Sequence, residues 1–287
     1  ISTILPDMTF EEALETTKIY SVAGLLSSDS GIIKQRPFRS PHHTMSSVSL
    51  AGGGAFPKPG EISLSHNGVL FLDELPEFNK NVTETLRQPL EDGNITISRA
   101  SGRYVFPSRF MLVCAMNPCK CGYYGSHRKQ CTCSDTERKK YLSRISGPLL
   151  DRIDIQIEVP VINYKEISSA VPSESSADIR KRVVAARNFM KRRCEETDRK
   201  YSDSDKAYPL FKNADMTPSQ IRRYCKMSPE ADTLLEAAYE KLQLSGRGHD
   251  RILRVARTIA DMSECTIIEK EHIAEAIHFR TLDRPYW

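Results

Sequence analysis

The chain has 287 residues, 39% of them hydrophobic and 27% charged, which is typical of a folded globular protein and excludes disordered and fibrous classes. No apolar run approaches the length needed to cross a membrane, and the first residues do not resemble a signal peptide, so we expect a cytoplasmic protein without a membrane partner. Forty-one basic and 37 acidic residues leave a net charge of +4, too small to indicate nucleic acid by itself.

The first part of the chain predicts alternating helices and strands. We expect a helix over residues 8–26 and then a long loop over 31–67, rich in Gly, Pro and Ser, of a kind that is usually functional. The unbroken apolar run 69–72 predicts a strand buried on both faces. The elements expected after it are a helix over 79–91, a β-hairpin around 100–102, a second buried strand over 110–116, a helical region over 136–150 and an alternating strand over 153–160.

Helical periodicity dominates after Pro172. The expected helices cover residues 175–197, 217–226, 228–243, 249–264 and 269–281. This change of character predicts a boundary near 165–175, with an α/β domain over 1–170 and a helical domain over 171–287.

Two carboxylates end the first buried strand, where GVLFLDELPEF runs into Asp73 and Glu74. Open α/β sheets bind ligands at the carboxyl edge of their strands. In nucleoside triphosphatases the first such carboxylate holds Mg²⁺, and the second orients and deprotonates the attacking water. Asn117 ends the second buried strand and could align the same water. Taken alone, the carboxylates could equally cap a turn, and Asn117 could start an Asn-Pro turn.

Several longer segments together resemble one family. The segments GVLFLDELPEF, LRQPLEDGNITISRASGRYVFPSRFMLVCAMNPCKCGYYG, YLSRISGPLLDRIDIQIEVP and SGRGHDRILRVARTIADM are closely similar to magnesium-chelatase-related AAA+ ATPases of the ComM/YifB type. The resemblance covers nearly the whole chain. It implies an AAA+ P-loop NTPase α/β core with a C-terminal helical lid, and ATP hydrolysis with Mg²⁺ by a ring, a homo-hexamer. It also implies movement on single-stranded or branched DNA, as in branch migration during natural transformation.

Site residues carry over by position. The resemblance implies that Asp73 and Glu74 form the Walker B pair and that Asn117 is sensor 1. Arg152 is similar to the arginine finger that reaches a neighbouring subunit's nucleotide, with Arg144 as a second candidate.

Three arginines near the start of the helix DRILRVARTIADM compete for a further role. Arg247 is similar to sensor 2, and Arg251 and Arg254 lie close enough in the sequence to take its place. Each arginine by itself would be interpreted as a solvated charge.

Two basic residues flank the turn of the expected hairpin. In the resembled clade this hairpin faces the pore of the ring, which implies that Arg99 and Arg103 contact DNA. An edge hairpin kept soluble by its arginines is the alternative. The loop 31–67 corresponds to the family's helix-2 insert, a second candidate pore element. His42 and His43 in this loop lack a Glu or Cys at ligand spacing, so no metal site is predicted there.

The other half of a nucleotide site is missing from this sequence. A Walker B strand implies a P-loop, G-x-x-x-x-G-K followed by Ser or Thr, but the chain contains no Gly-Lys dipeptide. In the family the P-loop lies just upstream of the segment that corresponds to the first residues here. We therefore expect an incomplete core that lacks the first strand and the P-loop, and a fragment that does not hydrolyse ATP alone.

Four cysteines cluster in NPCKCGYYGSHRKQCTC, at positions Cys119, Cys121, Cys131 and Cys133. Four thiolates can close a tetrahedral structural Zn²⁺ site, although paired ligands are normally two to four residues apart and here only one residue separates them. We favour zinc. The alternatives are four reduced thiols, a disulfide formed on purification, or a site in which His127 replaces one thiolate.

A rival function from another class is a chelatase-like motor that remodels a partner protein without binding DNA. Loss of salt-sensitive DNA affinity on removal of both hairpin arginines would separate the two. A third possibility is an interaction module whose ATPase has decayed, against which the presence of the candidate catalytic residues argues.

Overall fold

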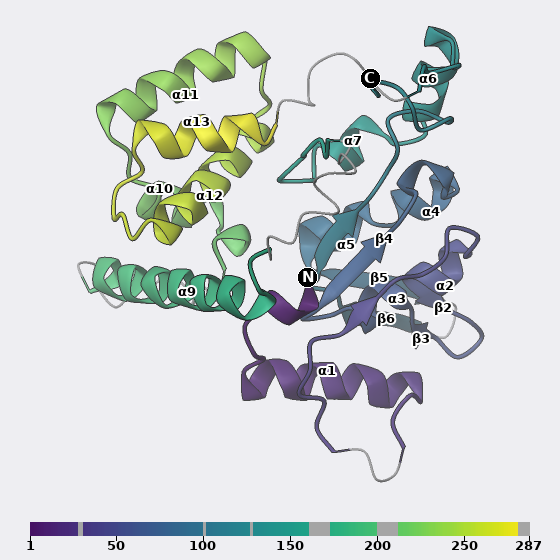
Figure 1. The fold of residues 1–287 in the computed structure, drawn as a ribbon. Helices are drawn as coiled ribbons and strands as arrows, with labels where there is room; N and C mark the ends of the chain where they lie inside the picture. Colours follow the sequence, from purple (N-terminus) through teal and green to yellow (C-terminus); the bar gives the residue numbers. More distant parts are fainter. Residues whose placement is uncertain (28–30, 100–101, 127–128, 161–172, 200–211, 281–287) are drawn as a thin grey trace. The chain divides into compact units, whose positions relative to one another are not determined.

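The computed structural model describes residues 1–27, 31–99, 102–126, 129–160, 173–199 and 212–280 (Figure 1). The chain divides into two units. Residues 7–153 form the first, together with Ile1 and Ser2, and the second begins at Asp154 and includes residues 3–6. The predicted boundary near 165–175 falls mostly on residues outside the described ones and stays a prediction.

The first helix of the first unit is α1 (Phe10–Ala23), inside the predicted range 8–26. A short 3-10 turn, η1 (Ser2–Ile4), precedes it in the chain. The Thr9 hydroxyl accepts a hydrogen bond from the Glu12 N–H, and the Glu12 carboxylate accepts one from the Thr9 N–H. This reciprocal cap satisfies two backbone donors and fixes the start of the helix. Gly24, in the left-handed conformation, ends it.

Three parallel strands form the central sheet, in the order β1 (Phe38–Arg39), β4 (Val69–Leu72) and β7 (Met111–Cys114). β4 lies in the middle, and the side chains of Val69, Leu70 and Leu72 are fully buried. Burial on both faces explains why this strand shows no polar alternation. Both strands predicted from continuous apolar runs are present, but only β4 is buried as expected: β7 lies at the end of the strand order, Met111 is 44% exposed and its other residues are partly buried.

Short elements fill the predicted loop 31–67. They are α2 (Ser47–Ala51), α3 (Glu61–Leu64), and an antiparallel ribbon of β2 (Gly52–Gly53) and β3 (Lys58–Pro59). Leu50 and Ile62 flank the ribbon and are fully buried in the core of this unit, together with Leu70, Leu72, Leu86 and Leu149.

Two predicted helices are each interrupted. The range 79–91 forms α4 (Lys80–Glu84) and α5 (Arg87–Asp92), after the 3-10 turn η2 (Leu75–Glu77), and the range 136–150 forms α6 (Asp135–Leu142) and α7 (Gly147–Leu150). Pro89 and Pro148 explain the breaks, because proline has no N–H for the i→i−4 bond and is tolerated only in the first turn of a helix.

The predicted hairpin consists of β5 (Asn94–Arg99) and β6 (Gly102–Pro107), which pair in antiparallel register with Ser98 opposite Arg103. Its turn, Ala100 and Ser101, lies outside the described residues.

The strand predicted over 153–160 is wrong. Within the described residues this segment has no strand partner, and the Gln156 N–H donates to the Phe279 carbonyl at 2.8 Å. Ile155, Ile157 and Val159 are exposed. Alternating hydrophobicity predicts which side chains would share a face, but a strand also needs a neighbouring backbone with free hydrogen-bonding groups.

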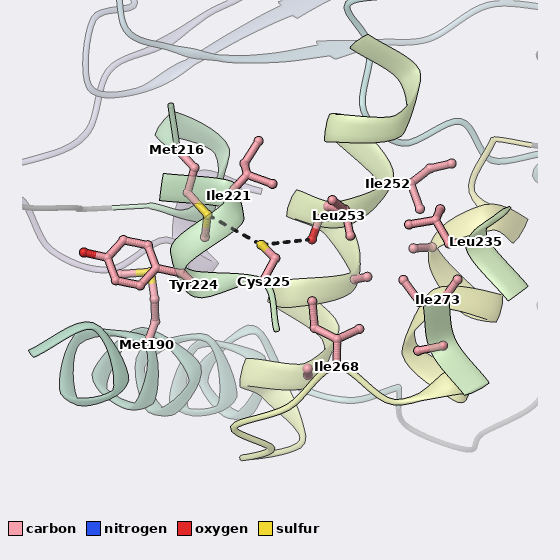
Figure 2. Close-up of a cluster of buried hydrophobic side chains, with 14 of the residues drawn as sticks. Met190, Met216, Ile221, Tyr224, Cys225, Leu235, Ile252, Leu253, Ile268 and Ile273 are labelled. Carbon is pink, nitrogen blue, oxygen red and sulfur yellow. Dashed lines mark hydrogen bonds between the residues drawn. The ribbon is translucent and has the colours of Figure 1, made fainter. Parts of the chain in front are cut away.

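The second unit is helical, as predicted. It contains α9 (Ser176–Asp198), α10 (Pro218–Tyr224), α11 (Pro229–Leu242), α12 (Gly246–Met262), α13 (Lys270–His278) and the 3-10 turn η4 (Asn213–Asp215). Figure 2 shows its core, to which each helix contributes, for example Met190, Ile221, Leu235, Ile252 and Ile273. Ser175, Thr217 and Ser245 cap the starts of three of these helices with their hydroxyl oxygens.

A charged cluster is buried within the helical unit. Asp261 accepts hydrogen bonds from Arg193 at 2.8 Å, from Arg257 at 3.1 Å and from the Asn213 amide at 2.7 Å. Each of these four side chains is at most 6% exposed. Among the described residues, no helix is both long and apolar enough to span a bilayer.

Candidate functional site

The Asp73–Glu74 pair lies directly after β4, the middle strand of the sheet. Both side chains are exposed, and Glu74 adopts the left-handed conformation with φ 52°. The Glu74 N–H donates to Asp73 Oδ1 at 2.9 Å. No cationic side chain among the described residues pairs with Asp73. An oxygen donor at a strand end, with no counter-ion of its own, is chemically suited to a hydrated Mg²⁺.

Asn117 follows the adjacent strand at the same sheet edge. The parallel register pairs Leu72 with Cys114, so the two chains leave the sheet side by side. The Leu75 N–H then donates to the Ala115 carbonyl at 3.0 Å, which ties the two strand ends together beyond the sheet. The structure thus brings the neighbourhoods of the carboxylate pair and of exposed Asn117 to one edge, as the sequence predicted.

His43 is a residue of this site that the sequence did not reveal. Its Nδ1 lies 3.4 Å from Oε2 of Glu74. The His42 ring stacks on His43 with centroids 4.1 Å apart, and Phe78 contacts His43 edge-on at 6.3 Å. The histidine is therefore held from two sides with one nitrogen towards the carboxylate. The sole signal in the sequence was the position of His43 in a long loop. Such a loop has no periodicity from which the direction of a side chain could be predicted.

The two arginine-finger candidates differ in their surroundings. The Arg152 side chain is 7% exposed and is bonded to Glu91 and to the Pro148 carbonyl. Arg144 is 49% exposed and donates to Glu77 at 2.8 Å and to the Pro76 carbonyl at 3.1 Å. The Arg144 side chain therefore contacts the turn η2 that follows Glu74, whereas the Arg152 side chain is bonded to Glu91 of α5.

The three sensor 2 candidates belong to the second unit, on α12. Arg247 is exposed in the first turn of the helix. Arg251 donates to Asp154 at 2.7 Å, and Arg254 donates to the Met216 carbonyl at 2.7 Å. Arg251 and Arg254 thus have structural partners inside their own unit.

The hairpin arginines have no such partners. The side chains of Arg99 and Arg103 are exposed and make no hydrogen bond or ion pair with any described residue. By contrast, Arg36 and Arg39 of the predicted insert pair with Glu12 and Glu61. An unpaired guanidinium is available to a phosphate, which a paired one is not.

The four cysteines converge on one point. Their sulfur atoms all lie within 4.8 Å of one another, and Cys119 Sγ lies 3.4 Å from Cys121 Sγ and 3.7 Å from Cys131 Sγ. A tetrahedral ion with metal–sulfur bonds of about 2.3 Å separates its sulfur ligands by roughly 3.8 Å, so the donor set fits zinc. Gly122 and Gly125 adopt positive φ and supply the bends that the C-x-C pairs require. His127 lies outside the described residues.

Protonation in the cluster is uneven. The backbone N–H groups of Tyr123 and Thr132 lower the pKa of Cys121 to about 5, whereas burial raises the pKa of Cys131. The lowered pKa of Cys121 favours its thiolate, the form that binds metals.

The cluster also borders Asn117. A Cβ placed on Gly122 would lie 3.9 Å from the amide carbon of Asn117, so the cysteine loop packs against that side chain.

Comparisons with known proteins cover both units. Residues 1–167 match the family described as magnesium chelatase, subunit ChlI, and residues 173–280 match the C-terminal family of the same subunit. The chain is 44% identical over 285 residues to the uncharacterized protein YifB of Escherichia coli strain K12, covering 99% of this chain and 53% of that protein.

Two further relatives agree. The competence protein ComM of Haemophilus influenzae is 44% identical over 285 residues, covering 98% of this chain and 52% of that protein. An uncharacterized protein of Mycobacterium tuberculosis strain H37Rv is 38% identical over 278 residues, covering 96% and 52%. The chain spans about half the length of the curated relatives it matches. It belongs to the magnesium chelatase family, among its proteins of the ComM/YifB type.

Proposed function

We propose that this chain supplies the hydrolytic edge of an AAA+ ATPase module. The observation that supports the proposal most is the junction of β4 and β7, where a carboxylate pair and an asparagine leave adjacent parallel strands at one edge. Asp73 holds the magnesium ion of MgATP, and Glu74 accepts the proton of the attacking water. Asn117 aligns that water. Bound Mg²⁺ neutralises charge on the phosphates, and the protein contributes positioning and electrostatics.

The arginine-finger candidates act only in an assembly of several subunits. In a homo-hexameric ring, the finger that reaches a neighbour's ATP is Arg152 or Arg144. Arg152 must first leave Glu91, whereas the half-exposed Arg144 needs a smaller rearrangement. One of Arg247, Arg251 and Arg254 senses the nucleotide from the helical unit, which acts as the lid.

DNA is the substrate that we favour for the motor, in the cytoplasm. The name of the Haemophilus influenzae relative, a competence protein, and the two unpaired hairpin arginines support it. Arg99 and Arg103 would contact the phosphates of a single-stranded or branched substrate, which the motor moves. The second candidate is a chelatase-like motor that remodels a partner protein, supported by the match to magnesium chelatase subunits.

ATP hydrolysis tests the proposal. We would measure turnover with and without single-stranded or branched DNA, using a form of the protein that carries a P-loop upstream of these residues. Glu74→Gln is the test variant, and Glu236→Gln, an exposed glutamate on α11, is the control. DNA-stimulated turnover that Glu74→Gln abolishes is the expected result. Turnover indifferent to DNA favours the chelatase-like motor, and no turnover favours a decayed module.

Zinc is the structural ion that we propose for the cysteine cluster. Metal analysis of protein purified without chelators should find one equivalent per chain, because four thiolates close the site. Far less than one equivalent would contradict this part of the proposal.

A further inference from the structure

Phe56 is 87% exposed, more than any other large apolar side chain among the described residues. It lies in the turn of the ribbon formed by β2 and β3. A single exposed apolar side chain is common on protein surfaces and does not by itself indicate a site. Its neighbours decide what it can bind.

The ribbon that carries Phe56 is closely packed. A Cβ on Gly52 would lie 2.5 Å from the Lys58 carbonyl oxygen, and one on Gly60 would lie 2.3 Å from the Gly52 nitrogen. Only glycine permits this approach of the two backbones. Both ends of the ribbon are anchored, because Leu50 and Ile62 are fully buried. The ring of Phe56 is therefore presented on a fixed support.

Unpaired positive charges lie beside the ribbon that carries Phe56. The hairpin strand β5 runs beside the ribbon, where Arg99 Nη2 lies 3.2 Å from the position of a Cβ on Gly53. Lys58 is opposite Gly53 in the ribbon register. The side chains of Lys58 and Arg99 are exposed, and neither makes a hydrogen bond or ion pair with a described residue.

The nearby acidic residue does not neutralise these cations. Glu61 follows the ribbon, and both of its carboxylate oxygens are bonded to Arg39, at 2.6 and 2.7 Å. The surface thus combines an exposed aromatic ring with two unpaired cations, Lys58 and Arg99.

We propose that Phe56, Lys58 and Arg99 form a contact site for single-stranded nucleic acid, in which the Phe56 ring stacks on a base and the two cations contact the flanking phosphates. This inference rests on the proposed DNA motor and adds the ribbon to its substrate surface. An aromatic ring next to cations is the arrangement that binds single strands without sequence preference, because every base has a face to stack.

Stacking and phosphate contacts differ in their response to salt, so one titration separates them. We would measure the affinity of the 287-residue chain for a fluorescent oligo(dT) at several salt concentrations. Phe56→Ala should weaken binding by about 5- to 100-fold with an unchanged salt slope. Arg99→Ala should reduce the slope of log K against log salt by about 0.7.

Matched variants keep the test independent of folding. Phe10→Ala removes another exposed phenylalanine, 65% exposed on α1, and should leave the affinity unchanged. Phe56→Tyr keeps a ring and should bind as the unchanged protein does, whereas Phe56→Leu keeps an apolar side chain and should bind as weakly as Phe56→Ala. Phe56→Trp, combined with Trp287→Phe to remove the single native tryptophan, should lose fluorescence when the oligonucleotide stacks on it.

The outcomes distinguish this inference from the function on which it rests. Equal affinity of the unchanged protein and Phe56→Ala, with a reduced slope for Arg99→Ala, overturns the stacking site and leaves the DNA motor standing. No oligonucleotide binding by the unchanged protein overturns both. Equal affinities of Phe56→Tyr and Phe56→Leu would show that the ring is not used, and would favour a protein partner that needs only an apolar side chain.

Discussion

Replacing Asp261 by Asn should destabilise the helical unit strongly. The carboxylate is the anion that serves two buried guanidinium groups, because Arg193 and Arg257 both donate to it. Burial holds the pKa of Arg257 below its ordinary value, which shows how much this charge depends on a partner. The substitution keeps the volume but leaves two buried cations without an anion, and it turns one acceptor oxygen into a donor that faces other donors.

The expected loss in the free energy of unfolding follows from the buried ion pairs that the substitution breaks. Breaking a buried ion pair by removing one partner costs about 3–5 kcal/mol, because the remaining charge is left uncompensated. Since about 1.4 kcal/mol corresponds to a factor of ten, the ratio of folded to unfolded helical unit should fall by roughly two to three and a half powers of ten. Arg257 also donates to the carbonyl of Thr266, which the change leaves in place.

Urea denaturation followed by circular dichroism measures this change. Glu174→Gln is the control, because the Glu174–Arg182 pair is about half exposed and such pairs contribute about 0–1 kcal/mol. A loss of less than about 1 kcal/mol for Asp261→Asn would refute the reasoning. It would mean that water or a shift of the helices supplies the missing partner.

Three further predictions concern the site and the thiols. His43→Gln should lower kcat for ATP hydrolysis by roughly 10- to 100-fold with KM nearly unchanged. The reason is that His43 contacts the Glu74 carboxylate and not the nucleotide, so its loss loosens only the carboxylate. His278→Gln is the control, and an unchanged kcat for His43→Gln would contradict this role. Cys131→Ser should abolish zinc binding and lower the melting temperature of the first unit, as calorimetry with metal analysis would show; retention of one equivalent would disagree. Burial raises the pKa of Cys225 to about 12, so at pH 8 its thiolate fraction is on the order of 10⁻⁴, and mass spectrometry should find this thiol unalkylated until the helical unit unfolds.

The sequence predicted the elements whose pattern is local. The run around Val69 is the middle strand of the sheet because apolar residues on both of its faces favour burial between layers, whereas the similar run around Met111 forms a strand at the end of the strand order with Met111 44% exposed. The five later helices were predicted within a few residues, and Ser175 and Thr217 mark two of their starts with a capping hydroxyl, whereas the cap Ser245 was missed because that helix was expected to begin at 249. The convergence of the four cysteines was also predictable, because their chemistry requires a common partner.

The failures all depend on distant parts of the chain. Ile155, Ile157 and Val159 alternate as a strand would, but pairing needs a second backbone that the sequence pattern does not locate. The contact between His43 and Glu74 joins residues 31 positions apart through the course of a loop, which no spacing rule describes. The finger and sensor roles of the arginines stay predictions, because they concern a nucleotide and a neighbouring subunit.

The cysteine cluster should allow extra residues to be inserted into the loop between its two C-x-C pairs. The two C-x-C pairs hold the two ends of the segment between them close together. The length of that segment therefore does not set the positions of Asn117 or of the start of α6. Closure entropy grows only with the logarithm of loop length, and a Cβ at Gly125 would meet no atom within 4 Å. A short epitope or spin label inserted after Gly125 should therefore be tolerated, and it would report the surroundings of this loop in solution.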